Sequence, residues 1–385
     1  MPNHLQAGTE AIIVAIADAS EGLLTIDLGA ICENYRRLNA RLGPEVRCSA
    51  VVKADAYGLG VAKVAPALYR EGCRDFFVAT QAEGVRLGAL LPDDARIIIL
   101  SGVRPGREKE CALAGLVPTL VNTAQVQSWA SCCRALGIPA PSVLKMDSGM
   151  GRLGLSAREV RGLLAQPELL KALNPCMFIS HLACADEPAH PLNQQQLSLF
   201  SALAAEVRAV LPDIVLSLAN SSGIFLGEAY HFDLVRPGAA LYGINPEPEN
   251  PNPLCAVVQL SLPVIQIRHV EKDCTVGYGA AGKMPAGGVM AVARGGYADG
   301  LLRAQSNRGS GEVAGVRVPM VGTISMDSTM FDISALPEPQ RSEIKEIEVI
   351  NRNLTVDEVA RHAGTIGYEV LTSLGSRYFR RYLKT

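Results

Sequence analysis

Tryptophan, aromatic side chains and excess charge are all scarce in this chain of 385 residues. It contains one Trp, aromatics make up 5% of its residues, and its formal net charge at pH 7 is −2. Lys and Arg form no dense run that would suit the phosphate backbone of a nucleic acid or an anionic membrane surface. The composition therefore predicts small molecules as the polar partners, with no nucleic acid and no membrane among them.

The ten cysteines lack the patterns that bind metals or form a disulfide framework. No two of them form a Cys-x-x-Cys pair, no Cys/His cluster has zinc spacing, and Cys132 and Cys133 are adjacent but unaccompanied. Free cysteine behaves as a small apolar residue, and scattered free cysteines are typical of a reducing cytosol. We therefore expect no metal site and a cytoplasmic location.

No apolar run near the start of the chain is long enough to cross a bilayer. Residues 11–17 are apolar and small, so they resemble the short apolar region of a secretion signal. However, no Lys or Arg precedes them and Glu10 lies directly beside them, which argues against export. Residues 1–23 are predicted to be an N-terminal extension.

From Leu24 onward, short apolar runs alternate with amphipathic stretches, and glycines such as Gly72 and Gly137 mark helix ends. Runs that are apolar throughout suit strands covered on both faces, and eight of them separated by helices suit a (β/α)₈ barrel of the TIM type. The sequence predicts this α/β barrel over residues 24–250. The eight runs are 49–53, 76–79, 97–100, 117–121, 142–147, 176–182, 213–218 and 232–236.

The barrel pattern stops at a proline-rich stretch, residues 245–253. Four prolines among these nine residues cannot continue a helix or a central strand, so we expect a domain boundary here. Residues 251–385 are predicted to form a mostly β domain with one short helix from Thr355 to Gly364. Its predicted strands are 255–268, 289–294, 312–321 and 328–333.

The stretch Val51–Gly58 reads as a buried strand that delivers Lys53 at its end and then turns. An amine at the rim of an apolar strand is partly desolvated, which lowers its pKa and makes it a nucleophile toward an aldehyde. The alternative is an ordinary surface lysine that closes a strand.

Polar side chains recur at the carboxyl ends of other predicted barrel strands, where barrel enzymes place their reactive groups. The turns after the last two runs contain small residues, Ser221 to Gly223 and Gly238 to Ala240, which let backbone N–H groups approach a phosphate. A Schiff-base lysine together with a phosphate cradle points to pyridoxal phosphate as the cofactor. The polar residues at the strand ends are Lys53, Lys145, Asp147, His181, Asn220, Ser221 and Arg236.

Ten short motifs in order along most of the chain resemble those of the alanine racemase family. Together they are specific, although each alone is weak. They are Ile26–Leu28, Val52–Gly58, Leu144–Gly154, His181–Asp186, Asn220–Ser221, Val235–Gly238, Gly277–Gly279, Gly296–Gly300, Met326–Asp327 and Tyr368–Val370.

The resemblance implies an isomerase that interconverts L- and D-alanine with pyridoxal 5'-phosphate, to supply D-alanine or to catabolise it. Lys53 would hold the cofactor covalently, His181 would orient Arg236, and Arg236 would face the pyridine nitrogen. The resemblance also assigns cofactor contacts to Tyr57, Arg152, Asn220, Ser221, Gly238, Ala239 and Tyr368.

By the same resemblance, Lys53 and Tyr278 are the two catalytic bases, one for each face of the substrate. Tyr278 would reach into the active site of a partner subunit, which makes the protein a homodimer. Lys145 would be carbamylated and would position Arg152; the alternative is an ordinary Lys145 paired with Asp147. The resemblance assigns substrate binding to Arg152, Met326 and Asp327, and an access corridor to Tyr297, Arg303 and Asp186.

The chain departs from the family pattern at four positions, where Thr323, Ser325, Gly367 and Leu59 replace the usual Arg, Cys, Asn and His. These departures predict a shift in substrate range or rate. Two alternatives to an alanine racemase also stay open. One is a related racemase with broader or different amino-acid specificity, for example toward serine. The other is a non-catalytic barrel protein that carries pyridoxal phosphate.

Overall fold

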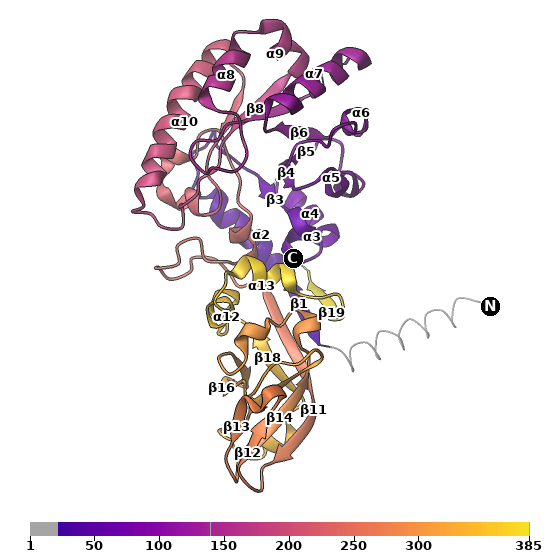
Figure 1. The fold of residues 1–385 in the computed structure, drawn as a ribbon, viewed down its shortest axis with the longest axis vertical. Helices are drawn as coiled ribbons and strands as arrows, with labels where there is room; N and C mark the ends of the chain where they lie inside the picture. The colour runs from indigo at the N-terminus through magenta and orange to yellow at the C-terminus, as the bar shows by residue number, and fades with distance from the viewer. Residues whose placement is uncertain (1–21, 139, 385) are drawn as a thin grey trace, which may run out of the picture. The chain divides into compact units, whose positions relative to one another are not determined.

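The computed structural model describes residues 22–138 and 140–384, and these form two compact units (Figure 1). The barrel unit comprises residues 30–255. The β unit comprises, among the described residues, 22–29 and 256–384. The predicted N-terminal extension lies outside the described residues except for its last two, Gly22 and Leu23.

A curled sheet of seven parallel strands forms the centre of the barrel unit, and its strands are neighbours in chain order. Most residues of these strands are apolar and buried, as expected for strands covered on both faces. The seven strands are β3 (Ala50–Val51), β4 (Asp75–Val78), β5 (Arg96–Ile99), β6 (Val117–Leu120), β7 (Ser142–Lys145), β8 (Pro175–Ile179) and β9 (Val215–Ser217).

An eighth strand, β10 (Leu234–Val235), joins the two edges of this sheet. It pairs in parallel with β2 (Arg47–Cys48), which is separated from β3 only by Ser49. On its other side, Asp233 N–H donates to Leu216 C=O at 3.1 Å and Arg236 N–H donates to Ala219 C=O at 3.0 Å, beside β9. Each of the eight predicted runs overlaps one of these strands, so the predicted α/β barrel class is confirmed.

Helices follow the strands and lie on the outside of the sheet (Figure 1). The predicted helix ends at Gly72 and Gly137 are confirmed, because both glycines have positive φ, 98° and 66°, just after helices. No helix in the described part of the chain is both long and apolar enough to cross a membrane. The helices are α2 (Leu28–Asn39), α4 (Val61–Arg70), α5 (Gln81–Gly88), α6 (Glu108–Leu113), α7 (Thr123–Leu136), α8 (Ala157–Leu164), α9 (Pro167–Leu173) and α10 (Pro191–Val210).

The first strand, β1 (Leu23–Asp27), requires a correction to the predicted start of the barrel at residue 24. It pairs antiparallel with β11 (Val258–His269) and parallel with β19 (Phe379–Leu383), so it belongs to the β unit. A five-residue apolar run carries no information about which sheet it joins. Only the pairing of segments far apart in the chain decides this.

The β unit is mostly β, as predicted, and β11 organises it. Residues 260–263 of β11 pair with β18 (Glu346–Ile350), and residues 264–269 pair with β14 (Val289–Arg294). Each pairing contains one register shift, after Leu260 and after Val264. The remaining strands are β12 (Cys274–Val276), β13 (Gly282–Met284), β15 (Ser310–Val313), β16 (Val316–Pro319) and β17 (Ser328–Asp332), and the helices are α11 (Gln340–Glu343), α12 (Val356–Ala363) and α13 (Gly367–Ser373).

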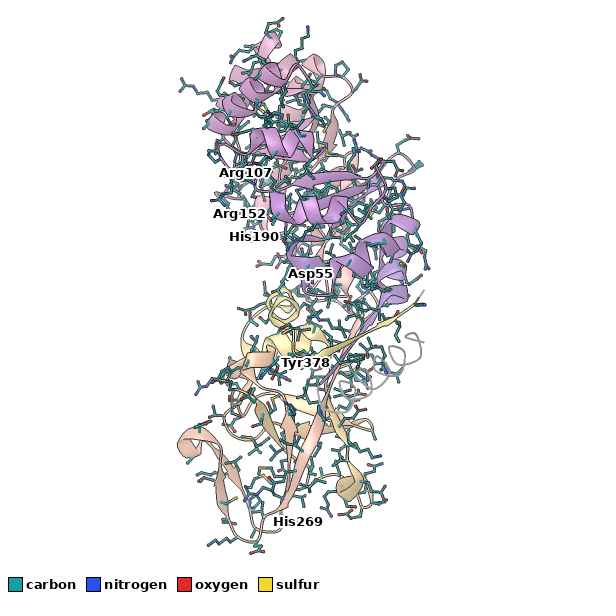
Figure 2. All side chains as sticks on the ribbon, turned by 90° about the vertical axis from the view of Figure 1, so that its right-hand side faces the viewer. Asp55, Arg107, Arg152, His190, His269 and Tyr378 are labelled. Atoms are coloured by element: carbon teal, nitrogen blue, oxygen red, sulfur yellow. The ribbon has the colours of Figure 1, made fainter. Side chains whose placement is uncertain are left out.

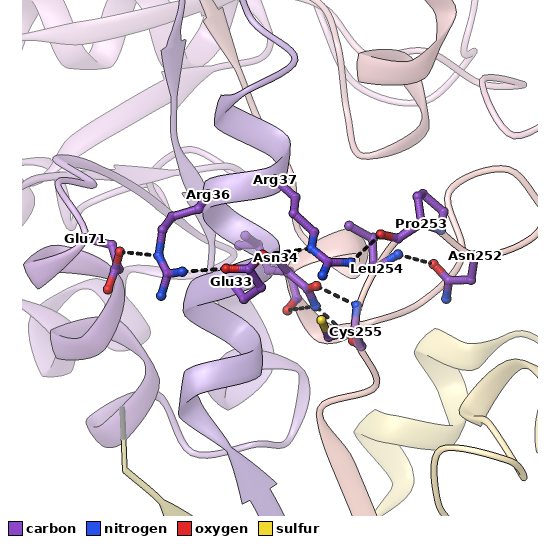
Figure 3. Close-up of polar contacts among 10 residues, drawn as sticks. Glu33, Asn34, Arg36, Arg37, Glu71, Asn252, Pro253, Leu254 and Cys255 are labelled. Atoms are coloured by element: carbon purple, nitrogen blue, oxygen red, sulfur yellow. Dashed lines mark hydrogen bonds and ion pairs between the residues drawn. The ribbon is translucent and has the colours of Figure 1, made fainter.

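Asn34 on α2 explains why the barrel unit extends to Cys255 rather than to the predicted residue 250. Its buried amide donates to Leu241 C=O at 3.2 Å and to Cys255 C=O at 3.0 Å, and it accepts from Cys255 N–H at 2.7 Å. On the same helix, Arg37 donates to Pro253 C=O at 2.9 Å (Figure 3). The proline-rich stretch is thus bonded back onto the barrel unit before the chain enters the β unit.

The substitution Asn34→Ala should lower the free energy of unfolding of the barrel unit by about 2–4 kcal/mol, because it leaves three buried or partly buried backbone groups without this partner. Fluorescence of the single tryptophan, Trp129, reports this unit, since its ring is buried on α7. Exposed Asn39 on the same helix is the control, and Asn39→Ala should change the free energy by less than about 1 kcal/mol. Equal urea midpoints for the two variants would contradict the role of Asn34.

Candidate active site

Lys53 is followed by a left-handed turn of four residues at the mouth of the barrel unit. Ala54, Asp55, Ala56 and Tyr57 have φ values of 53°, 56°, 54° and 56°. None of them is a glycine, and each such residue costs about 1–2 kcal/mol relative to the right-handed conformation. Strain of this kind persists only where surrounding contacts impose it, and it is concentrated at functional sites.

Side chains from neighbouring elements hold this turn in place. Glu83 on α5 accepts from Ala54 N–H at 2.8 Å, while its other oxygen accepts from Thr80 N–H at 3.1 Å. The carboxylate of Asp55 accepts from Val61 N–H at 2.8 Å, at the start of α4. Glu83 was not among the predicted site residues, although the spacing Thr80-x-x-Glu83 is a capping-box signal.

The amine of Lys53 lies in a cationic environment. Burial and the charge of Arg152 lower the pKa of Lys53, and Glu83 only partly offsets them. Both effects favour the neutral amine, the form that attacks an aldehyde. The lowered pKa of Lys53 therefore favours the chemistry that the sequence predicts at this position.

Lys145, at the end of β7, is buried beside the same cations. Burial, followed by the charges of Arg236 and Arg152, lowers the pKa of its amine to about 8. Asp147, the alternative partner of Lys145, instead organises the loop that carries Arg152. Its carboxylate accepts from Gly149 N–H at 2.9 Å, and also from the N–H groups of Met150, Gly151 and Arg152.

Arg236 and His181 meet at the ends of β10 and β8. The guanidinium of Arg236 is buried, which lowers its pKa to about 10, so it keeps its charge at neutral pH. It donates to the hydroxyl of Ser217, to Ser180 C=O and, at 3.4 Å, to Nδ1 of His181. Burial and the charge of Arg236 hold the pKa of His181 well below its ordinary value, so this imidazole is neutral and accepts through Nδ1.

The turns after β9 and β10 pack against each other through Ser221. Its buried hydroxyl accepts from Gly238 N–H at 3.0 Å and from Ala240 N–H at 3.1 Å. Asn220 stabilises the first turn by accepting from Gly223 N–H at 2.9 Å. Ala239, buried between these N–H groups, begins the short 3₁₀ helix η3 (Ala239–Tyr242).

The hydroxyl of Tyr57 lies against the second of these turns, at Gly238. A Cβ atom at Gly238 would lie 2.4 Å from this oxygen, so only glycine leaves room here. The Tyr57 ring packs on Tyr242, with ring centroids 4.8 Å apart. The hydroxyls of Tyr57 and Ser221 and the backbone of Gly238 thus form a small polar cradle, and the phosphate site predicted here stays a prediction.

The remaining barrel residues of the predicted site occupy loops. Arg152 lies in the loop after β7, and Figure 2 marks it in the barrel unit together with Asp55. Asp186 is exposed after β8.

Gln196 on α10 was not predicted as a site residue. Its buried amide donates to Ser148 and to His181 C=O and accepts from Ala183 N–H, and these bonds connect the ends of β7 and β8.

The predicted site residues of the β unit lie on exposed turns. Tyr278 is 74% exposed and Met326 is 53% exposed, which is unusual for large apolar side chains. Tyr297 begins the short helix η5 (Tyr297–Asp299), Arg303 begins η6 (Arg303–Gln305), and Tyr368 lies on α13.

Arg377, which sequence reasoning missed, connects two of these turns. Its guanidinium pairs with Asp299 through two bonds, at 2.6 and 2.9 Å, and with Asp327 at 2.8 Å. Figure 2 marks the adjacent Tyr378 in the β unit. Arg377 is 78 residues from Asp299 and 50 residues from Asp327 in the sequence, so no local pattern predicts these ion pairs.

Comparison with protein families identifies this arrangement. Residues 26–246 match the alanine racemase N-terminal domain, and residues 257–382 match the alanine racemase C-terminal domain. The chain belongs to the alanine racemase family. The resemblance seen in the ten sequence motifs is thereby confirmed.

Curated alanine racemases match this family member over nearly its whole length. The alanine racemase of Rhodospirillum rubrum is 47% identical over 365 residues, which cover 95% of this chain and 96% of that protein. The catabolic alanine racemase of Mesorhizobium japonicum is 48% identical over 369 residues, which cover 96% and 95%.

Solved alanine racemase structures share the fold. The crystal structure of alanine racemase from Bartonella henselae with covalently bound pyridoxal phosphate has a TM-score of 0.89 and 39% identity, and the match covers 94% of this chain and all of that one. The Streptomyces coelicolor enzyme has the same TM-score at 34% identity, covering 96% of this chain and all of that one.

Replacing Ala54 by glycine should stabilise the barrel unit, because glycine adopts the left-handed conformation without strain. We expect Ala54→Gly to raise the free energy of unfolding by about 0.5–1 kcal/mol. Ala202, exposed in the middle of right-handed α10, is the matched control, and Ala202→Gly should lower it by about 1 kcal/mol. Urea unfolding followed by Trp129 fluorescence tests whether the two changes have opposite signs.

Proposed function

We propose that this protein is an isomerase that interconverts L-alanine and D-alanine with pyridoxal 5'-phosphate, with Lys53 and Tyr278 as its two acid–base residues. The main support is the surroundings of Lys53, a partly buried amine whose pKa is lowered by burial and by Arg152 on the strand-end side of a barrel. On the same side lie the Ser221–Gly238–Tyr57 cradle and the Arg236–His181 pair.

The residues present fit the cofactor. The absence of a Cβ at Gly238 lets the Tyr57 hydroxyl approach this turn, so that it lies beside Ser221. Tyr57, Ser221, Gly238, Ala239 and Tyr368 are the proposed contacts of the cofactor phosphate. Asn220 holds the first turn of this cradle, and Lys53 supplies the amine for covalent attachment. When bound, pyridoxal phosphate withdraws electrons from the substrate α-carbon and makes the α-proton acidic.

The charge of Arg236 would affect how strongly the bound cofactor withdraws electrons. Its guanidinium stays charged at neutral pH and is held by four neutral acceptors, those of Ser217, Ser180, Leu218 and His181. A guanidinium facing the ring nitrogen would donate a hydrogen bond to it but would not transfer its proton. Arg236 would therefore limit electron withdrawal by the cofactor and favour return of the α-proton over side reactions.

Racemisation needs the proton removed on one face and returned on the other, and two bases on opposite faces meet this need. Lys53 serves one face. For the other face we propose the partner subunit's Tyr278, so that the active form is a homodimer. The support is the 74% exposure of Tyr278 on a tight turn, where it projects away from its own unit.

Substrate binding is proposed for the loops that carry Arg152, Met326 and Asp327. Arg152 is a cation for the substrate carboxylate, and its loop is held in shape by Asp147. The N–H of Met326 would donate to the same carboxylate, and the ion pair between Asp327 and Arg377 holds this turn. The access corridor is assigned to three exposed residues, Tyr297, Arg303 and Asp186.

A cytoplasmic location is also proposed. The support is that all ten cysteines are free thiols, and the buried ones, such as Cys32 and Cys73, pack as small apolar residues.

Lys145 should carry a carbamate in the native enzyme. With a pKa of about 8, roughly a tenth of its amine is neutral at pH 7 and able to react with carbon dioxide. The resulting anion would relieve the repulsion between Lys145 and Arg152. Native mass spectrometry should show one added carbon dioxide per chain, absent from Lys145→Met; an unmodified Lys145 in fully active enzyme would contradict this.

Two substitutions separate cofactor attachment from proton transfer. Lys53→Ala should abolish both the visible absorption of the bound cofactor and racemisation. Tyr278→Phe keeps the absorption but should lower turnover of L- and D-alanine by about a hundredfold or more, since one face loses its base. Chiral product analysis with alanine and serine checks both predictions and compares the substrates.

If Tyr278→Phe racemises at the wild-type rate, the two-base assignment is wrong. If solvent deuterium enters the α-position of neither enantiomer of any small amino acid, the protein carries the cofactor without catalysis. If serine is turned over faster than alanine, the protein is a racemase of different specificity.

A further inference from the structure

The turn that carries Tyr278 has little side-chain packing of its own. It is the short helix η4 (Tyr278–Ala280) at the tip of the β12–β13 hairpin, and Gly277, Gly279 and Ala280 all have positive φ. The Tyr278 ring is 74% exposed, so contacts of the ring within its own unit do not determine where the phenol lies. Its position depends on how the backbone of the turn is anchored.

Thr323 anchors the turn at Tyr278 itself. The Thr323 hydroxyl donates to the backbone C=O of Tyr278 at 3.1 Å. Thr323 is only 8% exposed, so water competes little for this bond. A hydroxyl in this setting makes a directional contact that a methyl group of the same size does not replace.

Asn307 anchors the other end of the turn. Its amide donates to Ala281 C=O at 3.1 Å and accepts from Gly322 N–H at 2.6 Å, and so connects the hairpin to the segment that carries Thr323. Asn307 has a φ of 57°, a conformation that asparagine tolerates better than most residues.

Two glycines bring the hairpin and residues 322–323 into direct backbone contact. A Cβ at Gly282 would lie 2.5 Å from Gly322 N, and a Cβ at Gly322 would lie 2.7 Å from Val276 C=O. Beneath them, buried Val276 and Met284 belong to one hydrophobic cluster. The backbone that supports the Tyr278 turn is therefore close-packed, so a shift of residues 322–323 would displace the turn.

We propose that Thr323 and Asn307 are positioning residues that set the location of the Tyr278 phenol for proton transfer. The inference rests on the proposed role of Tyr278 as a base. Neither residue contacts the reacting atoms; each acts through the backbone of the turn. A small misplacement of a catalytic group lowers the rate of its own proton transfer and leaves cofactor binding intact.

The first test compares Thr323→Val, which removes only the hydroxyl, with Thr323→Ser, which keeps it. Thr323→Val should lower turnover by about tenfold, and Thr323→Ser should restore most of it. Asn307→Ala should resemble Thr323→Val. Thr275→Val, which removes an exposed hydroxyl from β12 of the same hairpin, is the matched control and should keep wild-type turnover.

The second readout identifies the proton transfer affected. With α-deuterated substrates, Thr323→Val should raise the primary isotope effect for only one enantiomer, the one whose α-proton Tyr278 removes. Visible absorption of the bound cofactor should stay unchanged. An equal change for both enantiomers, or loss of the absorption, would show a general structural effect and overturn the proposal.

A double mutant separates failure of this inference from failure of the proposed function. In a Tyr278→Phe background, Thr323→Val should cause no further loss of the residual rate, because the group it positions is gone. A further tenfold loss there overturns the positioning role. A fully active Tyr278→Phe instead refutes the proposed base, and wild-type behaviour of Thr323→Val beside an impaired Tyr278→Phe refutes only the inference.

Discussion

Mutual repulsion among cations at the mouth of the barrel unit is the constraint on which the site depends. Lys53, Lys145, Arg152 and Arg236 all act on one another or on His181, and together with burial they lower the pKa of both lysines and of the imidazole. A lowered pKa at Lys53, a pKa of about 8 at Lys145 and a neutral imidazole at His181 follow from this crowding and from burial. Repulsion among these cations destabilises the fold, and negative charges relieve it. The arrangement therefore suits a site that binds an anionic cofactor and a substrate carboxylate.

The backbone after Lys53 is strained as well. Four consecutive non-glycine residues in the left-handed conformation are stable only because Glu83, Asp55 and the start of α4 hold them. The same turn brings the Tyr57 hydroxyl to Gly238, so the strain places two groups at once: an amine at one end and a hydroxyl at the other. Strain and crowded charge thus concentrate in one strand end, as expected where function outweighs local stability.

Prediction from the sequence succeeded wherever the signal was local. Each of the eight barrel runs overlaps a strand, and the helix ends at Gly72, Gly137 and Gly364 were visible as single residues. It failed where pairing is distant or the segment short. β1 was assigned to the barrel, the predicted strand 312–321 is a hairpin that turns at Ala314 and Gly315, and the short β12 and β13 beside Tyr278 were not predicted.

The sequence by itself determined the fold class, the family and the residue types at each strand end, because apolar periodicity and ordered motifs are properties of neighbouring residues. Only the tertiary structure decided which carboxylate, amide and hydroxyl groups hold the backbone around the site and the domain boundary: Glu83 at Ala54, Asp147 at Arg152, Asn34 at Cys255 and Thr323 at Tyr278. The longest of these contacts join residues far apart in the chain. A hydrogen bond depends on distance and direction in space, and nothing in the spacing of two such residues along the chain encodes either.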